Sequence, residues 1–226
     1  RMGLDAATLL AEVNPRLVIM CMAGSGSTGP ERDYAGYAPT FAALSGISYV
    51  SGAPGRAPFE FTGWPDLEVG VWGGIALVAA LMERRKTGTG TFIDLAGNEA
   101  LTWYTGEHLL EAAMNGRSPG PLGNRHPNIV QGCYRTAGDE RFISIAVKED
   151  AEWAALCRAM GKPEWIEDAR FATQTARLAN QDEIDRAVEA WTTPQDNVEL
   201  SSALQAAGVA AIPTFSGEQL HALPHL

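Results

Sequence analysis

The sequence predicts an α/β protein built in two parts, and three features support this. Residues 17–22 form a continuous apolar run of strand length, the pattern of a strand covered on both faces in an α/β sheet. A long apolar helix is expected at residues 66–86. A segment rich in proline and glycine at residues 115–127 separates it from a region with a different pattern of predicted strands and helices. With 46% hydrophobic and 19% charged residues, the 226-residue chain can bury a sizeable core, which excludes disorder of the whole chain.

The first part of the chain is expected to form helices and strands around a glycine-rich turn. A short amphipathic helix ends at Asn14-Pro15, and residues 24–30 make the turn after the first strand. Residues 51–65 open with closely spaced glycine and proline and are expected to form a loop. The expected helices span residues 6–13, 40–44, 66–86 and 98–114, and the expected strands span residues 17–22 and 91–95.

The helix at residues 66–86 carries the clearest boundary signals. Asp66 is a natural N-cap, and the cations at residues 84–86 followed by Gly88 are typical of a helix end. The nearly unbroken apolar run at residues 69–82 is shorter than the roughly 20 residues that a membrane helix needs. We therefore expect the buried helix of a soluble protein.

Beyond residue 130 the chain is expected to form a smaller α+β domain. Its strands are expected at residues 132–135 and 141–147, and its helices at residues 150–160, 168–179, 182–191 and 198–207. The expected organisation is a central piece of a large domain at residues 1–115, a linker at 116–130 and the small domain at 131–226.

Charge and cysteine content narrow the class of protein. The chain has 17 Lys+Arg against 27 Asp+Glu, a net charge of −10, which argues against nucleic acid and anionic membrane surfaces as partners. Its 3 cysteines are odd in number and far apart, which favours buried thiols in a reducing compartment, so we expect a cytoplasmic protein. Residues 1–5 lack the apolar stretch of a signal peptide. The histidines offer no H-x-x-x-H pair, so no metal site is expected.

The turn at residues 24–29 matches the G-x-G-x-x-G pattern of dinucleotide-binding proteins. That pattern requires a helix directly after it and an acidic residue about 20 positions further on. Residues 30–33 show no apolar helical face, and residues 49–51 contain no Asp or Glu. The favoured interpretation is therefore a turn that lets backbone approach a neighbour closely, rather than an NAD site.

Asp66 stands at the start of the long apolar helix expected at residues 66–86, and two interpretations of this carboxylate stay open. It is either an N-cap that accepts amide hydrogen bonds, or a nucleophile held at the positive end of a helix. A carboxylate there is ionised at neutral pH without a general base and can attack an activated acyl carbon. Glycines at positions 70, 73 and 74 leave room for a ligand or another backbone to come close.

Motifs along nearly the whole chain resemble those of the family III CoA-transferases. They are individually loose, but they occur in the family's order, which makes the resemblance specific. The similar segments are residues 14–18, 24–30, 36–37 and 43–46, Pro65-Asp66 with Gly70, residues 77–81 and 84–90, Asp94, and residues 123–127.

The resemblance implies a fold and an activity. The fold is a partial Rossmann-like large domain followed by a smaller α+β domain, incomplete at both ends because family members begin with a Rossmann-like half. The activity is transfer of CoA from an acyl-CoA donor to a carboxylic acid, with Asp66 on the family's catalytic aspartate and an aspartyl-CoA thioester as intermediate. Coenzyme A is then a substrate, no cofactor is permanently bound, and the protein is an interlocked homodimer.

The resemblance also implies two sets of contacts. Contacts to CoA fall on Ala35, Gly36, Tyr37 and Ala38, although Tyr37 is equally well read as a core aromatic. Arg125 and His126 stand where the family has a loop near the reacting aspartate, and they are expected either to meet an acceptor carboxylate or to lie in a solvated loop.

Two rival functions stay open. The racemase branch of the same superfamily has a His-Asp pair where this chain has Tyr37-Ala38. A tyrosine, with a pKa of about 10, is a poor base at neutral pH, which favours transfer over racemisation. The second rival is a non-catalytic half-module or an inactive fragment, because the family's opening half is absent from this sequence.

Overall fold

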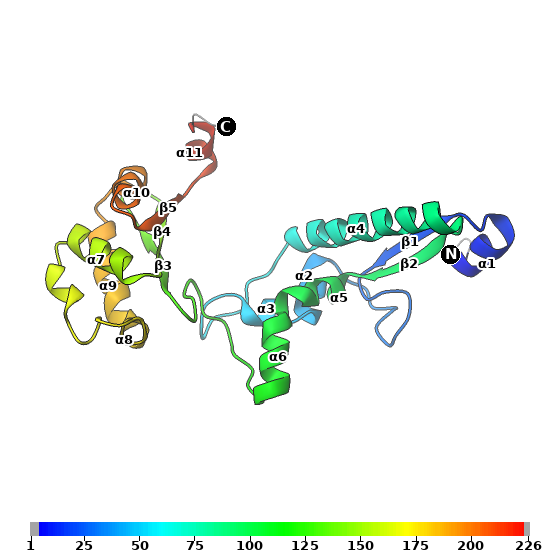
Figure 1. The fold of residues 1–226 in the computed structure, drawn as a ribbon, viewed down its shortest axis with the longest axis horizontal. Helices are drawn as coiled ribbons and strands as arrows, with labels where there is room; N and C mark the ends of the chain where they lie inside the picture. The colour runs from blue at the N-terminus through cyan, green and yellow to red at the C-terminus, as the bar shows by residue number, and fades with distance from the viewer. Residues whose placement is uncertain (1–4, 224–226) are drawn as a thin grey trace. The chain divides into compact units, whose positions relative to one another are not determined.

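The computed structural model describes residues 5–223, and contacts divide the chain into two units, Arg1–Gly123 and Asn124–Leu226 (Figure 1). The boundary falls inside the segment predicted as a linker, residues 116–130. Residues 1–4, on which most of the signal-peptide argument rests, lie outside the described residues. The mixture of helices with two separate sheets confirms the α/β class.

A two-stranded parallel sheet organises the first unit. Strand β1 (Val18–Ala23) pairs with β2 (Thr91–Ala96), with Val18 opposite Thr91 and Ala23 opposite Ala96. Parallel strands need a long crossover, and here it contains helix α4 (Trp64–Thr87), which packs along both strands (Figure 1). The strands were predicted correctly. The expectation that the first is covered on both faces is wrong for the described residues, because β1 is only half-buried and Met22 is 45% exposed.

Helix α4 begins earlier than the sequence indicated. Gly63 is the N-cap, and Pro65 occupies the first turn, where a missing N–H is tolerated. Asp66 therefore lies within the first turn, and its interpretation as the N-cap is wrong. The other end was predicted correctly, since Gly88 adopts a φ of +76° and its N–H donates to the Arg84 carbonyl at 2.9 Å.

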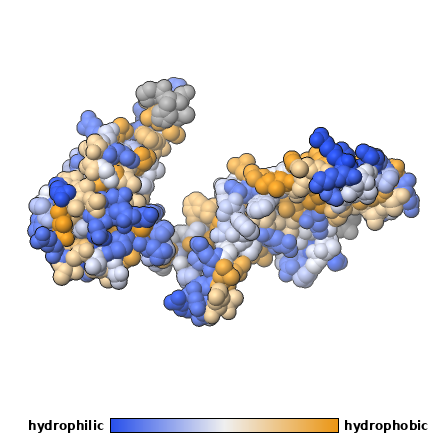
Figure 2. Space-filling model, viewed as in Figure 1, coloured by the Kyte–Doolittle hydropathy of each residue, from blue (hydrophilic) through white to orange (hydrophobic). Residues whose placement is uncertain are grey.

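One face of α4 is exposed, although a buried helix was expected. Only 17% of its 18-residue apolar window is buried. By length and composition alone α4 could cross a membrane, but the core helix of a soluble protein passes the same test. Figure 2 shows hydrophobic side chains at the surface along this helix. Among residues 5–223 no layer covers this apolar stripe, whose members are Leu67, Val71, Ile75, Val78 and Met82.

The remaining helices of the first unit are short. The helix predicted at residues 98–114 is interrupted, because Thr105 leaves the helical region at φ −111° and ψ 14°. The elements are α1 (Ala6–Thr8), a π-helical turn (Leu9–Val13), α2 (Ala38–Leu44), α3 (Ile47–Val50), α5 (Gly97–Thr102), a 3₁₀ turn (Trp103–Thr105) and α6 (Gly106–Asn115).

The second unit is built on an antiparallel sheet in the order β3-β4-β5. Strand β3 (Val130–Arg135) and β4 (Phe142–Val147) confirm the predicted strand pair. Strand β5 (Ala210–Thr214) was missed, because it is short and contains a proline, which fits an edge strand.

Helices cover one face of this sheet. They are α7 (Asp150–Ala159), a 3₁₀ turn (Pro163–Ile166), α8 (Gln174–Ala179), α9 (Gln181–Thr192) and α10 (Asn197–Ala206). The short helix α11 (Gly217–His221) follows β5. Alternate strand residues such as Ile143, Ile145 and Val147 enter the core that these helices close. Trp153 is 1% exposed within this core and packs against Trp165 and Phe171.

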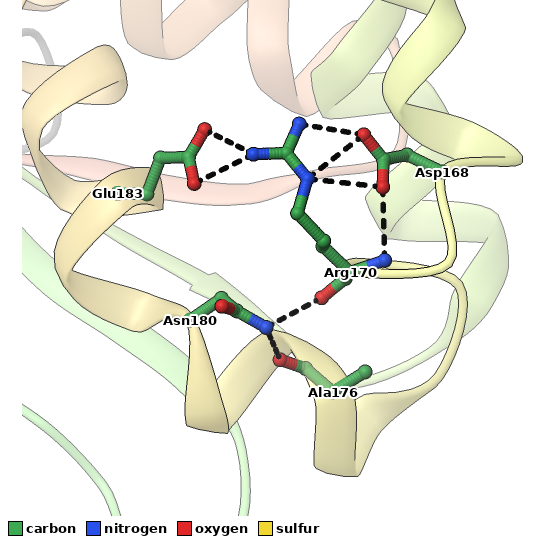
Figure 3. A network of polar contacts seen from close by, with 5 residues as sticks. All are labelled: Asp168, Arg170, Ala176, Asn180 and Glu183. Carbon is green, nitrogen blue, oxygen red and sulfur yellow. Dashed lines mark hydrogen bonds and ion pairs between the residues drawn. The ribbon is translucent and has the colours of Figure 1, made fainter.

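The helix predicted at residues 168–179 is reduced to α8, because a polar network replaces its first half (Figure 3). The Arg170 guanidinium lies 2.7 Å from carboxylate oxygens of both Asp168 and Glu183. The Asn180 amide donates to the carbonyls of Arg170 and Ala176. Asp168 thus forms a local turn with Arg170 instead of a helical turn.

Candidate functional site

Asp66 faces a small hollow in the first unit. The hollow has a volume of about 270 Å³ and is lined by Met22, Ala23, Gly24, Phe41, Asp66, Val69 and Gly97. Asp66 is the one charged side chain in this lining. Its carboxylate is exposed and makes no hydrogen bond or ion pair with any of residues 5–223. The first turn of α4 places it near unpaired backbone N–H groups, which favour a negative charge.

The parallel sheet explains where this hollow lies. Ala23 and Ala96 are paired at the carboxyl ends of β1 and β2, and the chain leaves each strand through a glycine. The Asn98 N–H donates to the Gly24 carbonyl at 2.9 Å, which ties the two exits together. Ligands of α/β sheets bind outside the carboxyl ends of the strands, and Asp66 is at that edge.

The turn after β1 is held by a carboxylate from β2. Asp94 accepts hydrogen bonds from the Ser27 N–H at 3.0 Å and from the Ser27 hydroxyl at 2.6 Å. Gly26 adopts a φ of +78°, which a residue with a side chain rarely takes. The next helix, α2, begins only at Ala38, so no helix opens directly after Gly29 and the dinucleotide pattern lacks its structural context.

A second hollow adjoins the first. It has a volume of about 300 Å³ and is lined by Ser25, Tyr34, Ala35, Thr40, Phe41, Ala43 and Leu44. Phe41 lines both hollows, and the consecutive residues Gly24 and Ser25 each line one. The structure therefore brings Ala35, one of the predicted CoA contacts, to the hollow next to that of Asp66.

The other predicted CoA contacts lie around the start of α2. Gly36 is in close contact with α2, because a Cβ there would lie 2.2 Å from the Thr40 hydroxyl oxygen. Tyr37 is 84% exposed, so its interpretation as a core aromatic does not hold within the described residues. Ala38 is 3% exposed and presents little surface to a ligand. Whether these residues bind CoA stays a prediction.

Arg125 and His126 belong to the second unit, where each has a partner. The Arg125 guanidinium pairs with the carboxylates of Asp182 and Asp185, with an Nη2–Oδ2 distance of 2.7 Å to Asp185. The hydrogen bond to Asp182 raises the pKa of Arg125 and lowers that of Asp182. His126 Nδ1 accepts from the Asn128 N–H at 3.1 Å. Any carboxylate ligand of Arg125 would compete with these two aspartates.

Glu68 differs from Asp66, although it lies only two residues away. Its carboxylate accepts a hydrogen bond from the Tyr104 hydroxyl, and this bond raises the pKa of Tyr104. The Tyr104 ring also packs edge-on against Trp64, at 5.1 Å between centroids. Glu68 is therefore engaged by Tyr104, whereas Asp66 makes no hydrogen bond or ion pair with residues 5–223.

Sequence reasoning missed Phe41 as a residue of the site. An aromatic side chain in a short apolar helix is normally read as core. The sequence held no signal for it, because the contacts of Phe41 with Gly24 and Gly36 exist only in the folded chain. Among residues 5–223 no cluster of three or more His, Cys, Asp or Glu side chains is arranged to hold a metal ion.

Comparison with known families gives a match over the whole chain. The sequence profile described as CoA-transferase family III covers residues 1–226. The chain is 30% identical to a succinate–glutarate CoA-transferase of Agrobacterium fabrum, over 99% of this chain and 56% of that protein. It is 31% identical to an acetyl-CoA:oxalate CoA-transferase of Acetobacter aceti, over 95% of this chain and 56% of that protein.

A solved structure shows the same fold. A CAIB/BAIF family protein from Brucella suis superposes with a TM-score of 0.88 at 31% identity, over 99% of this chain and 59% of that protein. The chain thus spans little more than half the length of these relatives.

Proposed function

The chain belongs to CoA-transferase family III, and from that premise we propose that its protein moves CoA from an acyl-CoA donor to a carboxylic acid, with Asp66 as the nucleophile. Relatives in the family act on CoA thioesters and carboxylic acids, as their names state. The observation that carries the assignment to Asp66 is its unpartnered carboxylate in an otherwise uncharged hollow.

The first half-reaction loads CoA onto the protein. A carboxylate oxygen of Asp66 attacks the thioester carbon of the donor, the carbon–sulfur bond breaks, and CoA leaves as a thiolate. The product on the protein is a mixed anhydride. The thiolate then attacks the side-chain carbonyl carbon of Asp66, which releases the donor acid as a carboxylate and leaves an aspartyl-CoA thioester.

The second half-reaction reverses these steps with the acceptor. The acceptor carboxylate attacks the aspartyl thioester, displaces the CoA thiolate and forms a second anhydride. The thiolate attacks the acceptor's acyl carbon, which gives the new acyl-CoA and regenerates the Asp66 carboxylate. The overall reaction converts one CoA thioester into another, so no ATP is consumed.

The surroundings of Asp66 support this role. A nucleophilic carboxylate must not be tied up in a hydrogen bond or ion pair, and Asp66 has neither among residues 5–223.

The test is CoA exchange by the full-length protein on a panel of acyl-CoA donors and carboxylic acid acceptors. We expect Asp66→Ala and Asp66→Asn to reduce exchange to below about one-thousandth of wild type, because covalent catalysis is lost. The matched control is Glu68→Gln, which keeps an acceptor for the Tyr104 hydroxyl and is expected to retain activity.

Two outcomes would favour the rivals. No CoA exchange by wild type would favour the non-catalytic half-module, and equal exchange by Asp66→Ala and wild type would refute Asp66 as the nucleophile. Deuterium incorporation at the donor's α-carbon without CoA exchange would favour the racemase.

We also propose that the protein is a cytoplasmic homodimer. The uncovered apolar stripe of α4 supports association with further protein surface, since exposed patches of this kind mark interaction sites. All three cysteines are free, in keeping with a reducing compartment. Light scattering of the full-length protein should give twice the monomer mass at micromolar concentration, and a monomer mass under those conditions would contradict the dimer.

A further inference from the structure

Ser25 is a polar residue at the junction of the two hollows of the first unit. It lines the hollow that contains Ala35, and its neighbour Gly24 lines the hollow that contains Asp66. Within the part of the chain that the structure describes, neither the N–H nor the hydroxyl of Ser25 forms a hydrogen bond. Ser25 therefore keeps its full hydrogen-bonding capacity for a ligand.

The turn that carries Ser25 is fixed on both sides. Before it, the Gly24 carbonyl accepts a hydrogen bond from the Asn98 N–H at 2.9 Å. After it, Ser27 donates to the Asp94 carboxylate from its N–H at 3.0 Å and from its hydroxyl at 2.6 Å. Asp94 lines neither hollow, so its effect on them passes through the turn.

The other polar side chains around Ala35 are less suited to hold a ligand. The Thr40 hydroxyl is already bonded to the Tyr37 N–H at 2.9 Å and to the Tyr37 carbonyl at 2.7 Å. Tyr34 is 65% exposed, so water can satisfy its hydroxyl. The rest of the lining is apolar and consists of Ala35, Phe41, Ala43 and Leu44. Ser25 is thus the polar group that stands next to the Asp66 hollow.

Two parts of an acyl-CoA whose thioester meets Asp66 are candidates for the adjoining hollow, the acyl chain and the CoA arm. A hydrocarbon chain would displace water from the Ser25 hydroxyl and leave it without a partner, which costs free energy. The CoA arm has an amide group two carbons from its sulfur, and an amide can both donate to and accept from a hydroxyl. The unpartnered hydroxyl of Ser25 therefore favours the CoA arm.

We infer that the Ser25 hydroxyl binds the amide of the CoA arm that lies nearest to the thioester, and that Asp94 positions Ser25 through Ser27. This inference rests on the proposed function, because it assumes that an acyl-CoA reacts at Asp66. It adds a binding residue outside the predicted CoA contacts at residues 35–38, and it directs the CoA arm, rather than the acyl chain, into the Ala35 hollow.

The test measures how strongly the full-length protein prefers a ligand with this amide. Dissociation constants are determined by calorimetry for S-ethyl-CoA and for an analogue in which methylene groups replace the amide nearest to the sulfur. We expect wild type to bind S-ethyl-CoA more tightly, and Ser25→Ala to lower this preference by about threefold or more, because one hydrogen bond is lost.

The matched control is Tyr34→Phe, which removes another hydroxyl from the same lining and should change the preference by less than about twofold. No preference for the amide in wild type, an unchanged preference in Ser25→Ala, or an equal loss in Tyr34→Phe would overturn the inference.

Substitutions of Asp94 test the positioning role. Asp94→Ala removes the acceptor of both Ser27 hydrogen bonds, and it should lower the preference for the amide to about the level of Ser25→Ala. The double variant should show little further loss, since both changes act on one contact. Asp94→Asn keeps an acceptor oxygen and should lie between wild type and Asp94→Ala. Equal weakening of both ligands in Asp94→Ala, with the preference unchanged, would refute the positioning role.

Binding separates this inference from the proposed function, because the two thioethers cannot react. A wild type that binds S-ethyl-CoA but exchanges no CoA refutes the proposed transfer, and the preference for the amide then still decides on Ser25. A wild type that exchanges CoA but shows no preference for the amide refutes the contact with Ser25 and leaves the transfer standing.

Discussion

Asp66 and Glu68 show how two carboxylates on one helix acquire different roles. Glu68 is bound by the Tyr104 hydroxyl, whereas Asp66 makes no polar contact with residues 5–223. The difference follows from helix geometry, since residues two apart point in nearly opposite directions. Asp66 turns toward the hollow at the ends of β1 and β2, and Glu68 turns toward the aromatic side chains of Trp64 and Tyr104.

Two glycines in the first unit should respond oppositely to substitution by alanine. A Cβ on Gly90 would lie 1.7 Å from the Leu17 carbonyl oxygen, so Gly90→Ala must move the backbone that joins β1 to β2. We expect it to lower the free energy of unfolding by about 1–3 kcal/mol. Gly74, inside α4, has no atom within 4 Å of its Cβ position, and Gly74→Ala should raise stability by about 0.5–1 kcal/mol.

Urea unfolding of the 226-residue chain measures both changes. Equal effects of the two substitutions would contradict the contact at Gly90.

At the scale of elements, α4 shows what the sequence could predict and what it could not. Its C-terminal signals, three cations and Gly88, act locally and placed the end correctly. Its start was misplaced because Asp66 is a good N-cap residue, while Pro65 at the first turn was the competing signal. The burial of α4 could not be predicted, since the sequence pattern of an apolar helix is the same whether or not another layer of the protein covers it.

The polar network around α8 predicts a pH dependence of stability. Hydrogen bonds from the Arg170 side chain hold the pKa of Asp168 below its usual value. A carboxylate whose pKa is lower in the folded state stabilises the fold above its unfolded pKa of about 4, and this contribution is lost as the pH falls through the folded pKa. The folded chain should therefore weaken below about pH 4.

Arg170→Gln isolates this contribution. The urea midpoint of the variant should fall less than that of wild type between about pH 5 and about pH 3, because Asp168 loses the guanidinium that lowers its pKa. An identical fall in both proteins would assign the acid sensitivity to other carboxylates.

The whole molecule consists of two units of different character. The second unit has a continuous core of buried side chains from its sheet and helices, and its first two strands were predicted from the sequence. The first unit leaves large apolar side chains of α4 exposed, and the chain spans little more than half of its relatives.

The order of the sequence motifs identified the family, because these motifs are spread along the whole chain. The place of Phe41 in the lining of the Asp66 hollow depends on contacts between residues 24, 36 and 41, which only the folded chain brings together.

The most direct test of the central claim is to trap the covalent intermediate. The full-length protein is incubated with acetyl-CoA and reduced with borohydride, which converts an aspartyl thioester or anhydride to an alcohol, and its peptides are then weighed by mass spectrometry. The account predicts reduction at residue 66 that requires acetyl-CoA and is absent in Asp66→Asn. Sustained CoA exchange with an unmodified residue 66 would contradict it.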